Sequence, residues 1–477
     1  MGLRLFNTLS RSIQEFKPLK GNTVRLYSCG PTVYDYSHIG NFRSFLFIDL
    51  LKRYLLFSGY DVIHITNLTD VDDRIIKRCA GEGISLSELT QKYRDAFFKD
   101  IETLSVLPST HYPAATDHIL EMQEMIKILV EKGFAYSTED GSVFFKISSF
   151  PEYGNLSRID ATRLSRTARM LNDQYEKEQI RDFALWKGWK EEDGDIYWDS
   201  PWGRGRPGWH VECSAMSMKF LGEEFDIHCG GIDLIFPHHE NEIAQTVCAT
   251  GKRFANLWLH CEHLLVDGAK MSKSLGNYYT LRDLVKEGVS SQTIRYFLIT
   301  TNYRQKINLT FKHLETAAKS LERLQDFRRR LEVIVGEESQ EGKDHHPAVI
   351  DQFCKAMDDD LNISEAMAAV FKWLRDVNRR LDAGQIFPEE AKDILVTVRK
   401  LDSVIGVIFN EEVYLSKRDR ALIQERESAR QVKDWKRADE IRKYFLKKRI
   451  RLEDTSHGTV VKYLSSSQFN PKSDIEV

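Results

Sequence analysis

VRLYSC (residues 24–29) and HIGN (residues 38–41) decide the fold of this 477-residue chain. The first is an apolar run typical of a buried strand, and the second opens the apolar-periodic segment 42–57, which predicts a helix. A strand, a glycine-containing turn and a helix start predict the beginning of a βαβ unit. Free N–H groups and the positive end of a helix favour a phosphate at such a turn. His38, Gly40 and Asn41 are therefore candidate phosphate ligands, although His38 is also compatible with an ordinary turn.

KMSKS (residues 270–274) is the second informative peptide. It places Lys270, Ser272 and Lys273 on a loop flanked by Gly268 and Gly276. Such a loop predicts a mobile cationic arm that closes over a triphosphate, whereas a Lys/Ser loop alone is equally typical of a solvated surface. In this order, the two peptides together indicate a phosphate-binding site.

The bulk composition agrees with that of a large soluble enzyme. The chain is long enough for several domains and a deep core, and its formal net charge of −3 argues against a generic polyanion binder. Seven scattered cysteines fit a reducing compartment with free or metal-bound thiols. The sequence shows neither a membrane-length apolar stretch nor a signal-peptide pattern, so we expect a cytoplasmic protein without a membrane partner.

Strand-like and helix-like runs alternate in the first half of the chain. Residues 62–66 predict a second strand after the 42–57 helix. A strand at 225–228, a helix at 240–250 and a strand at 258–261 predict the second half of the same sheet. In such a sheet ligands bind at the carboxyl ends of the strands, where both peptides would converge.

The other segments predict further domains. Residues 107–207, helical and turn-rich with a strand at 143–147, predict an insertion between the two halves of the sheet. Apolar spacing suited to a bundle recurs in residues 309–335, 347–357, 363–381 and 388–408. The predicted fold is therefore α/β: a doubly wound parallel-sheet (Rossmann-like) catalytic domain with an insertion, then an all-α helical bundle and a small mixed C-terminal domain.

The C-terminal region is strongly basic. Residues 417–451 contain 14 Lys/Arg and 6 Asp/Glu in an otherwise acidic chain. They predict two amphipathic helices, at about 418–433 and 435–448, followed by a short strand pair. Segregation of positive charge to one end favours a phosphate-backbone partner over a merely solvated face. Trp435 and Tyr444 could stack on splayed bases, but we favour a core position for both.

Four polar side chains suggest a metal site. His238 and Glu242 are four residues apart, so on a helix they share one face and can grip one ion. Cys29 ends the first strand, and Cys213 lies beside Trp209 at the mouth of the insertion. Two thiolates, an imidazole and a carboxylate make a credible tetrahedral zinc set. Buried cysteines and helical His/Glu pairs are common without a metal, and spacing alone does not exclude His239 in place of His238.

The two peptides resemble the signature sequences of class I aminoacyl-tRNA synthetases. Four further stretches look like cysteinyl-tRNA synthetase: YSCGPTVYDY (27–36), NLTDVDD (67–73), PGWHVECSAM (207–216) and FPHHENE (236–242). The resemblance runs from about residue 6 to about residue 461. The chain departs from the pattern at Asn41, where many relatives have His, and at Cys229, where Gly is common.

The resemblance implies roles for the candidate residues. Cys29, Cys213, His238 and Glu242 would hold one Zn²⁺, which selects the thiol of cysteine over the hydroxyl of serine because a serine hydroxyl is a poor ligand at neutral pH. Thr69, Asp70 and Trp209 would line the cysteine pocket, although Trp209 is equally compatible with packing. ATP, accompanied by Mg²⁺, would be bound by His38, Gly40, Asn41, Lys270, Ser272 and Lys273, with catalytic roles for His38, Asn41, Lys270 and Lys273.

The resemblance also implies the reaction and the domains. ATP, L-cysteine and tRNA(Cys) would give L-cysteinyl-tRNA(Cys), AMP and diphosphate through cysteinyl-adenylate, in a monomer. The expected domains are a first catalytic half (1–106), an insertion or connective domain (107–207), a second catalytic half with zinc ligands (208–262), a signature-loop region (263–308), a helical bundle (309–410) and an anticodon-binding domain (411–477). A ligase joining cysteine to an amino-sugar would lack the basic tail, and a non-catalytic relative would have lost signature residues.

Overall fold

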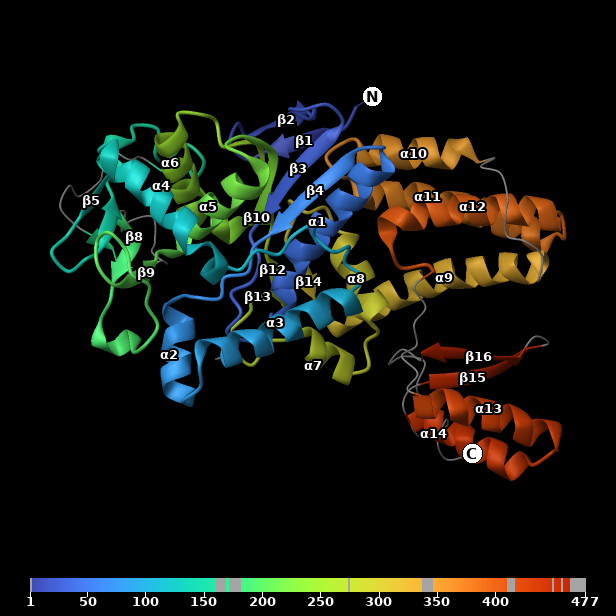
Figure 1. Cartoon of the computed structure of the whole chain (residues 1–477). Helices are drawn as coiled ribbons and strands as arrows, with labels where there is room; N and C mark the ends of the chain where they lie inside the picture. Colours follow the sequence, from blue (N-terminus) through green and yellow to red (C-terminus); the bar gives the residue numbers. More distant parts are fainter. Residues whose placement is uncertain are drawn as a thin grey trace. The chain divides into compact units, whose positions relative to one another are not determined.

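A computed structural model describes residues 2–159, 169–170, 182–272, 275–336, 346–409, 417–447, 450–455 and 458–463. The chain divides into two compact units (Figure 1). The first comprises Met1–Leu264, Thr301–Ile307 and Gln352–Met367, and the second comprises the remaining residues. Within the described ranges, every helix is too short or too polar to span a bilayer.

A parallel sheet with the strand order β11-β10-β3-β4 forms the centre of the first unit (Figure 1). Its strands are β3 (Thr23–Ser28), β4 (Asp61–Thr66), β10 (Phe225–Gly231) and β11 (Ala255–Cys261). The chain leaves β3 through α1 (Ile39–Phe57) toward β4, and it leaves β10 through α6 (Glu240–Thr250) toward β11. It therefore winds outward in opposite directions from the central pair, which confirms the predicted doubly wound sheet. The ligand crevice of such a sheet lies at the carboxyl ends of β3 and β10.

A capping box fixes the start of α1. His38 is extended (φ −82°, ψ 162°), and its Nδ1 accepts a hydrogen bond from the backbone N–H of Asn41 at 3.2 Å. In return, Asn41 Oδ1 accepts from the backbone N–H of His38 at 3.1 Å. The reciprocal bonds satisfy two N–H groups at the helix start, so both residues of the first peptide have a structural role as well.

Two hairpins complete the N-terminal part of the first unit. Strands β1 (Arg4–Asn7) and β2 (Ser12–Glu15) pair in antiparallel fashion. Helices α2 (Asp73–Glu82) and α3 (Leu86–Thr103) follow β4. The turn between these helices uses Gly83 in the left-handed conformation (φ 66°), which glycine adopts without strain.

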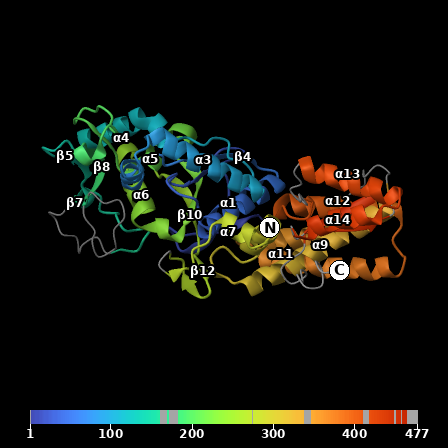
Figure 2. The same cartoon turned by 90° about the horizontal axis from the view of Figure 1, so that it is seen from below.

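The insertion contains more sheet than we predicted. Its helices and strands are α4 (Ile119–Glu131), β5 (Ala135–Ser137), β6 (Val143–Phe145), β7 (Arg169–Met170), β8 (Asp182–Gly188) and β9 (Gly205–Pro207). Only the strand near 143–147 was expected, because most of the others have two or three residues and carry no alternation. The small sheet shares an apolar cluster with α4, α5 (Trp209–Leu221) and α6, and these three helices lie together in Figure 2.

The second unit is mainly helical, as predicted. It contains α7 (Leu281–Lys286), α8 (Ser291–Ile299) and α9 (Phe311–Val335), and α9 packs on α8 and on α12 (Pro388–Ile405). The boundary between the units falls within α10 (Pro347–Met357) and α11 (Ile363–Asp382). The short strands are β12 (Leu264–Val266), β13 (Ala269–Lys270) and β14 (Ile307–Leu309), and the C-terminal part holds α13 (Lys417–Gln431), α14 (Trp435–Lys447), β15 (Ile450–Thr455) and β16 (Gly458–Tyr463).

Gly30, directly after β3, has no room for a side chain. A Cβ atom there would lie 1.7 Å from the backbone oxygen of Asn67, whose side chain accepts from the Gly30 N–H at 2.9 Å. We expect Gly30→Ala to lower the free energy of unfolding by about 3 kcal/mol, because the backbone at Asn67 must move to make room for the added methyl group. The matched control is Gly81→Ala on α2, where a Cβ meets nothing within 4 Å. This substitution should raise the free energy of unfolding by about 0.5–1 kcal/mol, because alanine loses less conformational freedom than glycine in a helix. Thermal unfolding of the two variants measures the difference, and equal midpoints would contradict the steric argument.

Candidate active site and metal centre

Four of the predicted ligands converge at the crevice. Cys29 follows β3, Cys213 lies on α5, His238 lies in the single helical turn Ile235–His239, and Glu242 lies in the first turn of α6. One ligand atom from each of the four lies within 4.8 Å of those of the other three. This convergence brings together residues that are far apart in the sequence.

The spacing of these atoms suits one small ion. The Sγ atom of Cys29 is 3.9 Å from that of Cys213 and 3.8 Å from Glu242 Oε1, and Glu242 Oε1 is 3.1 Å from His238 Nε2. Tetrahedral zinc with ordinary Zn–S, Zn–N and Zn–O bonds sets its ligand atoms roughly 3.3–3.8 Å apart. The donor set of two sulfurs, one nitrogen and one oxygen therefore fits zinc in both chemistry and spacing.

A second group of ligand atoms overlaps the first. Cys29 and Glu242 also lie within reach of His228, on β10, and of His239. His239 Nε2 is 3.3 Å from Cys29 Sγ, and its Nδ1 shares a hydrogen bond with His260 at 2.8 Å. His239 was the competitor expected from spacing, whereas His228 was missed. His228 could have been identified from the sequence as a histidine within a strand that was predicted to be buried and to end at the crevice.

The contacts of His228 favour a supporting role. Its Nε2 is 2.9 Å from Glu242 Oε2, and its ring stacks on Trp258 with centroids 4.5 Å apart. A histidine that holds the second oxygen of Glu242 orients the first oxygen toward Cys29 and His238, as the outer partners of metal ligands do. His210 stands in a similar relation to His238, with their Nδ1 atoms 3.0 Å apart.

Burial opposes charge on these side chains. It raises the pKa of Cys29 well above its ordinary value and raises the pKa of Glu242 to about 7. It also lowers the pKa of His238 to about 3, so this imidazole is neutral and able to donate a lone pair. A divalent cation would supply the positive charge that thiolates and a carboxylate require here.

Thr69 and Trp209, both predicted for the cysteine pocket, lie beside this cluster. Trp209 is half-buried and stacks on the His238 ring with centroids 4.2 Å apart. Thr69 donates its hydroxyl hydrogen to Glu212 Oε2 at 2.8 Å. Glu212 is fully buried next to Cys213, and sequence reasoning missed it because one acidic residue on an apolar helix gave no pattern.

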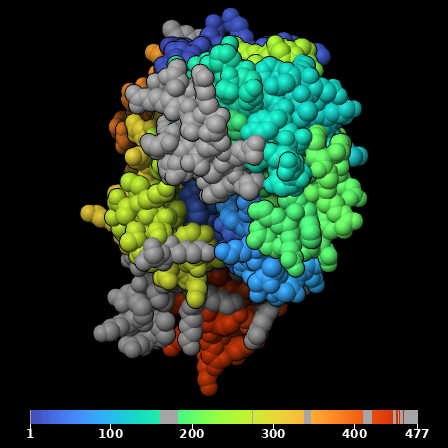
Figure 3. Space-filling model, turned by 90° about the vertical axis from the view of Figure 1, so that its left-hand side faces the viewer, coloured from blue at the N-terminus to red at the C-terminus, as the bar shows by residue number. Residues whose placement is uncertain are grey.

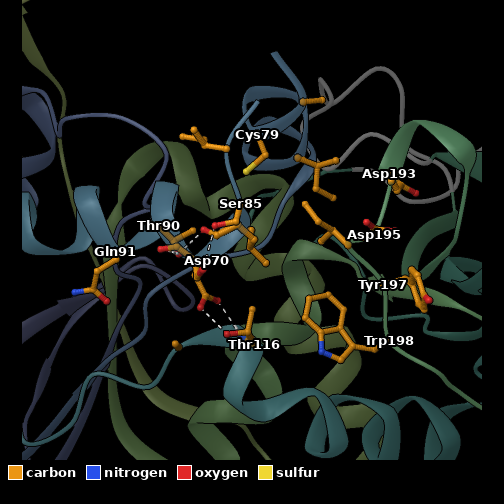
Figure 4. A pocket seen from close by; sticks show the side chains of 18 of the residues that line it. Asp70, Cys79, Ser85, Thr90, Gln91, Thr116, Asp193, Asp195, Tyr197 and Trp198 are labelled. Carbon is orange, nitrogen blue, oxygen red and sulfur yellow. Dashed lines mark hydrogen bonds between the residues drawn. The ribbon is translucent and has the colours of Figure 1, made fainter. Parts of the chain in front are cut away.

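Asp70 points elsewhere. Its carboxylate accepts from the Thr116 backbone N–H at 2.9 Å and from the Thr116 hydroxyl at 2.6 Å (Figure 4). It lines a groove of about 870 Å³ between the α2–α3 hairpin and residues 192–198, whose lining includes neither Thr69 nor Trp209. In Figure 3 the blue α2 region and the green segment after β8 lie next to each other on this face. Successive side chains of an extended segment point in opposite directions, so neighbours in sequence separate in space.

The nucleotide-binding candidates lie in both units. His38 and Asn41 cap α1 in the first unit, and burial lowers the pKa of His38, which keeps the imidazole neutral near pH 7. In the second unit, Lys270 is exposed at the end of β13. The backbone N–H of Ser272 donates to Asn277 Oδ1 at 2.8 Å. Lys273 lies outside the described residues.

The C-terminal aromatic residues differ from each other. Tyr444 packs against the apolar cluster of α14 and β15, and its hydroxyl donates to Asp419 at 3.0 Å, in line with the core position expected. For Trp435 that expectation is wrong. Its side chain is 54% exposed at the first turn of α14, with the Arg430 guanidinium 5.7 Å from its ring centroid.

Comparison with known proteins places the chain in a family. The model of the tRNA synthetases class I (C) catalytic domain matches residues 15–319, and that of the DALR domain matches residues 352–410. The cysteine–tRNA ligase of Protochlamydia amoebophila is 48% identical over 96% of this chain and 98% of its own length. The enzymes of Brachyspira hyodysenteriae and Chlamydia muridarum are each 46% identical, over 95% and 97% of this chain and 98% and 100% of their own lengths.

The chain belongs to the cysteine–tRNA ligase family. This membership confirms the resemblance and the predicted enzyme class. The solved structure of Mycobacterium tuberculosis methionyl-tRNA synthetase in complex with methionyl-adenylate matches with a TM-score of 0.61, covering 82% of this chain and 92% of that one. At 16% identity this likeness shows the fold alone. The catalytic-domain model that matches residues 15–319 identifies this fold as that of a class I synthetase.

Metal analysis distinguishes the two overlapping groups of ligands, because Cys213 belongs only to the first and His228 only to the second. We expect Cys213→Ser to weaken zinc binding more than about 100-fold, since loss of an outer partner alone costs about 10–100-fold. His228→Gln should fall within that smaller range, and the buried control Cys248→Ser should keep its zinc. Zinc content after dialysis against a graded chelator measures all three. Full retention by Cys213→Ser with loss from His228→Gln would assign the metal to the second group.

Proposed function

We propose that this chain is a cysteine–tRNA ligase that forms L-cysteinyl-tRNA(Cys) from ATP, L-cysteine and tRNA(Cys) through cysteinyl-adenylate. The observation that carries the proposal is the convergence of Cys29, Cys213, His238 and Glu242 within 4.8 Å, at the crevice where class I synthetases bind ligands. Near-full-length similarity to curated cysteine–tRNA ligases supports the same reaction.

The first step joins cysteine to AMP. A carboxylate oxygen of cysteine attacks the α-phosphorus of ATP, and pyrophosphate leaves with the electron pair of the broken P–O bond. No side chain acts as a nucleophile, so the protein contributes positioning and charge. His38, Gly40 and Asn41 hold phosphate oxygens at the start of α1, and Mg²⁺ accompanies the nucleotide.

The KMSKS peptide supplies positive charge for the same step. Lys270 and Lys273 neutralise charge that builds on the β- and γ-phosphates, and Ser272 contributes to the same loop. Asn277 hydrogen-bonds to the Ser272 N–H and to the Lys270 carbonyl, and these bonds hold Lys270 and Ser272 in place before ATP arrives. The 2′-hydroxyl of the terminal adenosine of the tRNA then takes the cysteinyl group from the adenylate.

Selection of cysteine depends on the four-residue cluster. Cys29, Cys213, His238 and Glu242 would hold Zn²⁺, which would supply a Lewis acid that favours a thiolate over a serine hydroxyl. Shape alone separates such close isosteres poorly. The walls of the pocket are Thr69, fixed by Glu212, and Trp209, while Asp70 anchors the segment that carries Thr69 through Thr116.

The basic C-terminal part provides the remaining contacts with tRNA. The side chains of α13 and α14 are rich in arginine and lysine, and Trp435 is exposed among them, where it can stack on a base. Arg426 is buried instead, and its bidentate pair with Asp454 at 2.7 and 2.8 Å ties α13 to β15. We propose that the enzyme works as a monomer in the cytoplasm.

Pyrophosphate exchange tests the proposal. Wild-type protein should incorporate labelled pyrophosphate into ATP only when cysteine is present. Lys270→Ala should lower kcat for exchange about 100-fold, because it removes a positive charge that stabilises the transition state. It should leave the KM for cysteine nearly unchanged. The matched control is Lys286→Ala, which removes an exposed lysine of α7 and should leave kcat and KM at their wild-type values. Exchange that does not require cysteine would refute the proposed function, and equal losses in kcat and in cysteine affinity would refute the role of Lys270.

A further inference from the structure

One segment of the first unit joins the two halves of the candidate site. Residues 29–38 run from the metal-ligand candidate Cys29 to His38, which caps α1. The first part of this segment is held by the chain after β4, since the N–H of Val33 donates to the Thr69 carbonyl at 3.0 Å and the N–H of Thr69 donates to the Pro31 carbonyl at 3.1 Å. The distance between the two ends therefore depends on how the second part, residues 34–37, is held.

Arg78 of α2 holds this second part. Its guanidinium donates to the Tyr34 carbonyl at 2.7 Å and lies 3.5 Å from the Asp35 carboxylate. The second terminal nitrogen of the guanidinium, Nη2, donates to the Tyr93 hydroxyl on α3 at 2.7 Å. Tyr36 in turn packs edge-on against the Tyr93 ring, with centroids 5.2 Å apart. One planar side chain thus joins the segment to both helices of the α2–α3 hairpin.

Arg74, one turn earlier on α2, contacts the same segment. Its guanidinium lies 4.8 Å from the centroid of the Tyr34 ring and donates to the Thr32 hydroxyl at 3.2 Å. The α2 helix is itself fixed at its first residue, because Asp73 pairs with Lys187 at 2.9 Å and with Arg206 at 2.6 Å. These ion pairs hold the start of α2 in place, and with it the helix that carries Arg74 and Arg78.

We propose that Arg78 is a positioning residue for adenylate formation: it sets the separation between the cysteine-binding end and the nucleotide-binding end of residues 29–38. The inference rests on the proposed function, since it concerns the same reaction. Attack of a carboxylate on phosphorus requires the two substrates to meet in line, and a misplacement of about 1 Å lowers the rate about 100-fold. Arg78 touches neither substrate site directly, so its loss alters the relative placement of the substrates more than the binding of either one.

The test compares Arg78→Ala and Arg78→Lys with two controls on the same helix. Glu82→Gln removes the negative charge of the exposed partner of Arg78, 2.6 Å away, and leaves the contacts of Arg78 with the segment in place. Lys77→Ala removes the adjacent, exposed positive charge. For each variant we would measure kcat and both KM values in cysteine-dependent pyrophosphate exchange, the zinc content and the thermal midpoint.

We expect Arg78→Ala to lower kcat about 100-fold while each KM stays within about threefold, a split that a loss of folded protein does not produce. Its zinc content and thermal midpoint should match those of Glu82→Gln. Arg78→Lys should recover only part of the rate, because lysine lacks the planar fork that reaches Tyr34 and Tyr93 together. Both controls should keep the wild-type kcat.

Three results would overturn the inference. The first is a kcat for Arg78→Ala within threefold of wild type, and the second is a rate for Arg78→Lys equal to wild type. The third is a loss of zinc or of thermal stability that accounts for the fall in activity. If wild-type protein itself shows no cysteine-dependent exchange, the proposed function fails. If wild-type protein shows cysteine-dependent exchange and the Arg78 variants have the wild-type kcat, the proposed function stands and only the role of Arg78 is refuted.

Discussion

The reversal of winding between β3 and β10 is the constraint on which the site depends. Because the chain leaves these adjacent strands in opposite directions, a crevice opens between the two connections at their carboxyl ends. Cys29 follows one strand, and the turn that carries His238 follows the other. A sulfur ligand and a nitrogen ligand are therefore brought to one place by topology, and the rest of the cluster comes from the helices that border the crevice.

Burial gives the cluster its chemical character. Water is excluded from side chains that would otherwise be hydrated, so charge on Cys29 or Glu242 requires a compensating positive charge. A bound cation would meet that need, and His228 Nε2 lies 2.9 Å from the second oxygen of Glu242, which orients the carboxylate. Under the proposed function, a metal bound there would favour a thiolate from the substrate over a hydroxyl, which would link the fold to the choice of amino acid.

Much of this arrangement could be predicted from the sequence, because strand, turn and helix signals around residues 24–57 are local. The placement of Asp70 and Thr69 could not, since two neighbours in an extended segment face opposite ways and only the packed fold shows which faces the cluster. Glu212 and His228 were missed for a related reason: each belongs to no local pattern, and its partner, Thr69 for Glu212 and Glu242 for His228, lies in another element. The resemblance to a family supplied the ligand set that spacing alone left open.

The central claim is that the cluster holds a metal to which the thiol of the substrate binds. X-ray absorption at the zinc edge tests it most directly, because the spectrum reports how many sulfur atoms surround the metal. With Cys29 and Cys213 as ligands, the account predicts two sulfur neighbours in the free enzyme, three after addition of cysteine, and two after addition of serine. A sulfur count that cysteine leaves unchanged would contradict it.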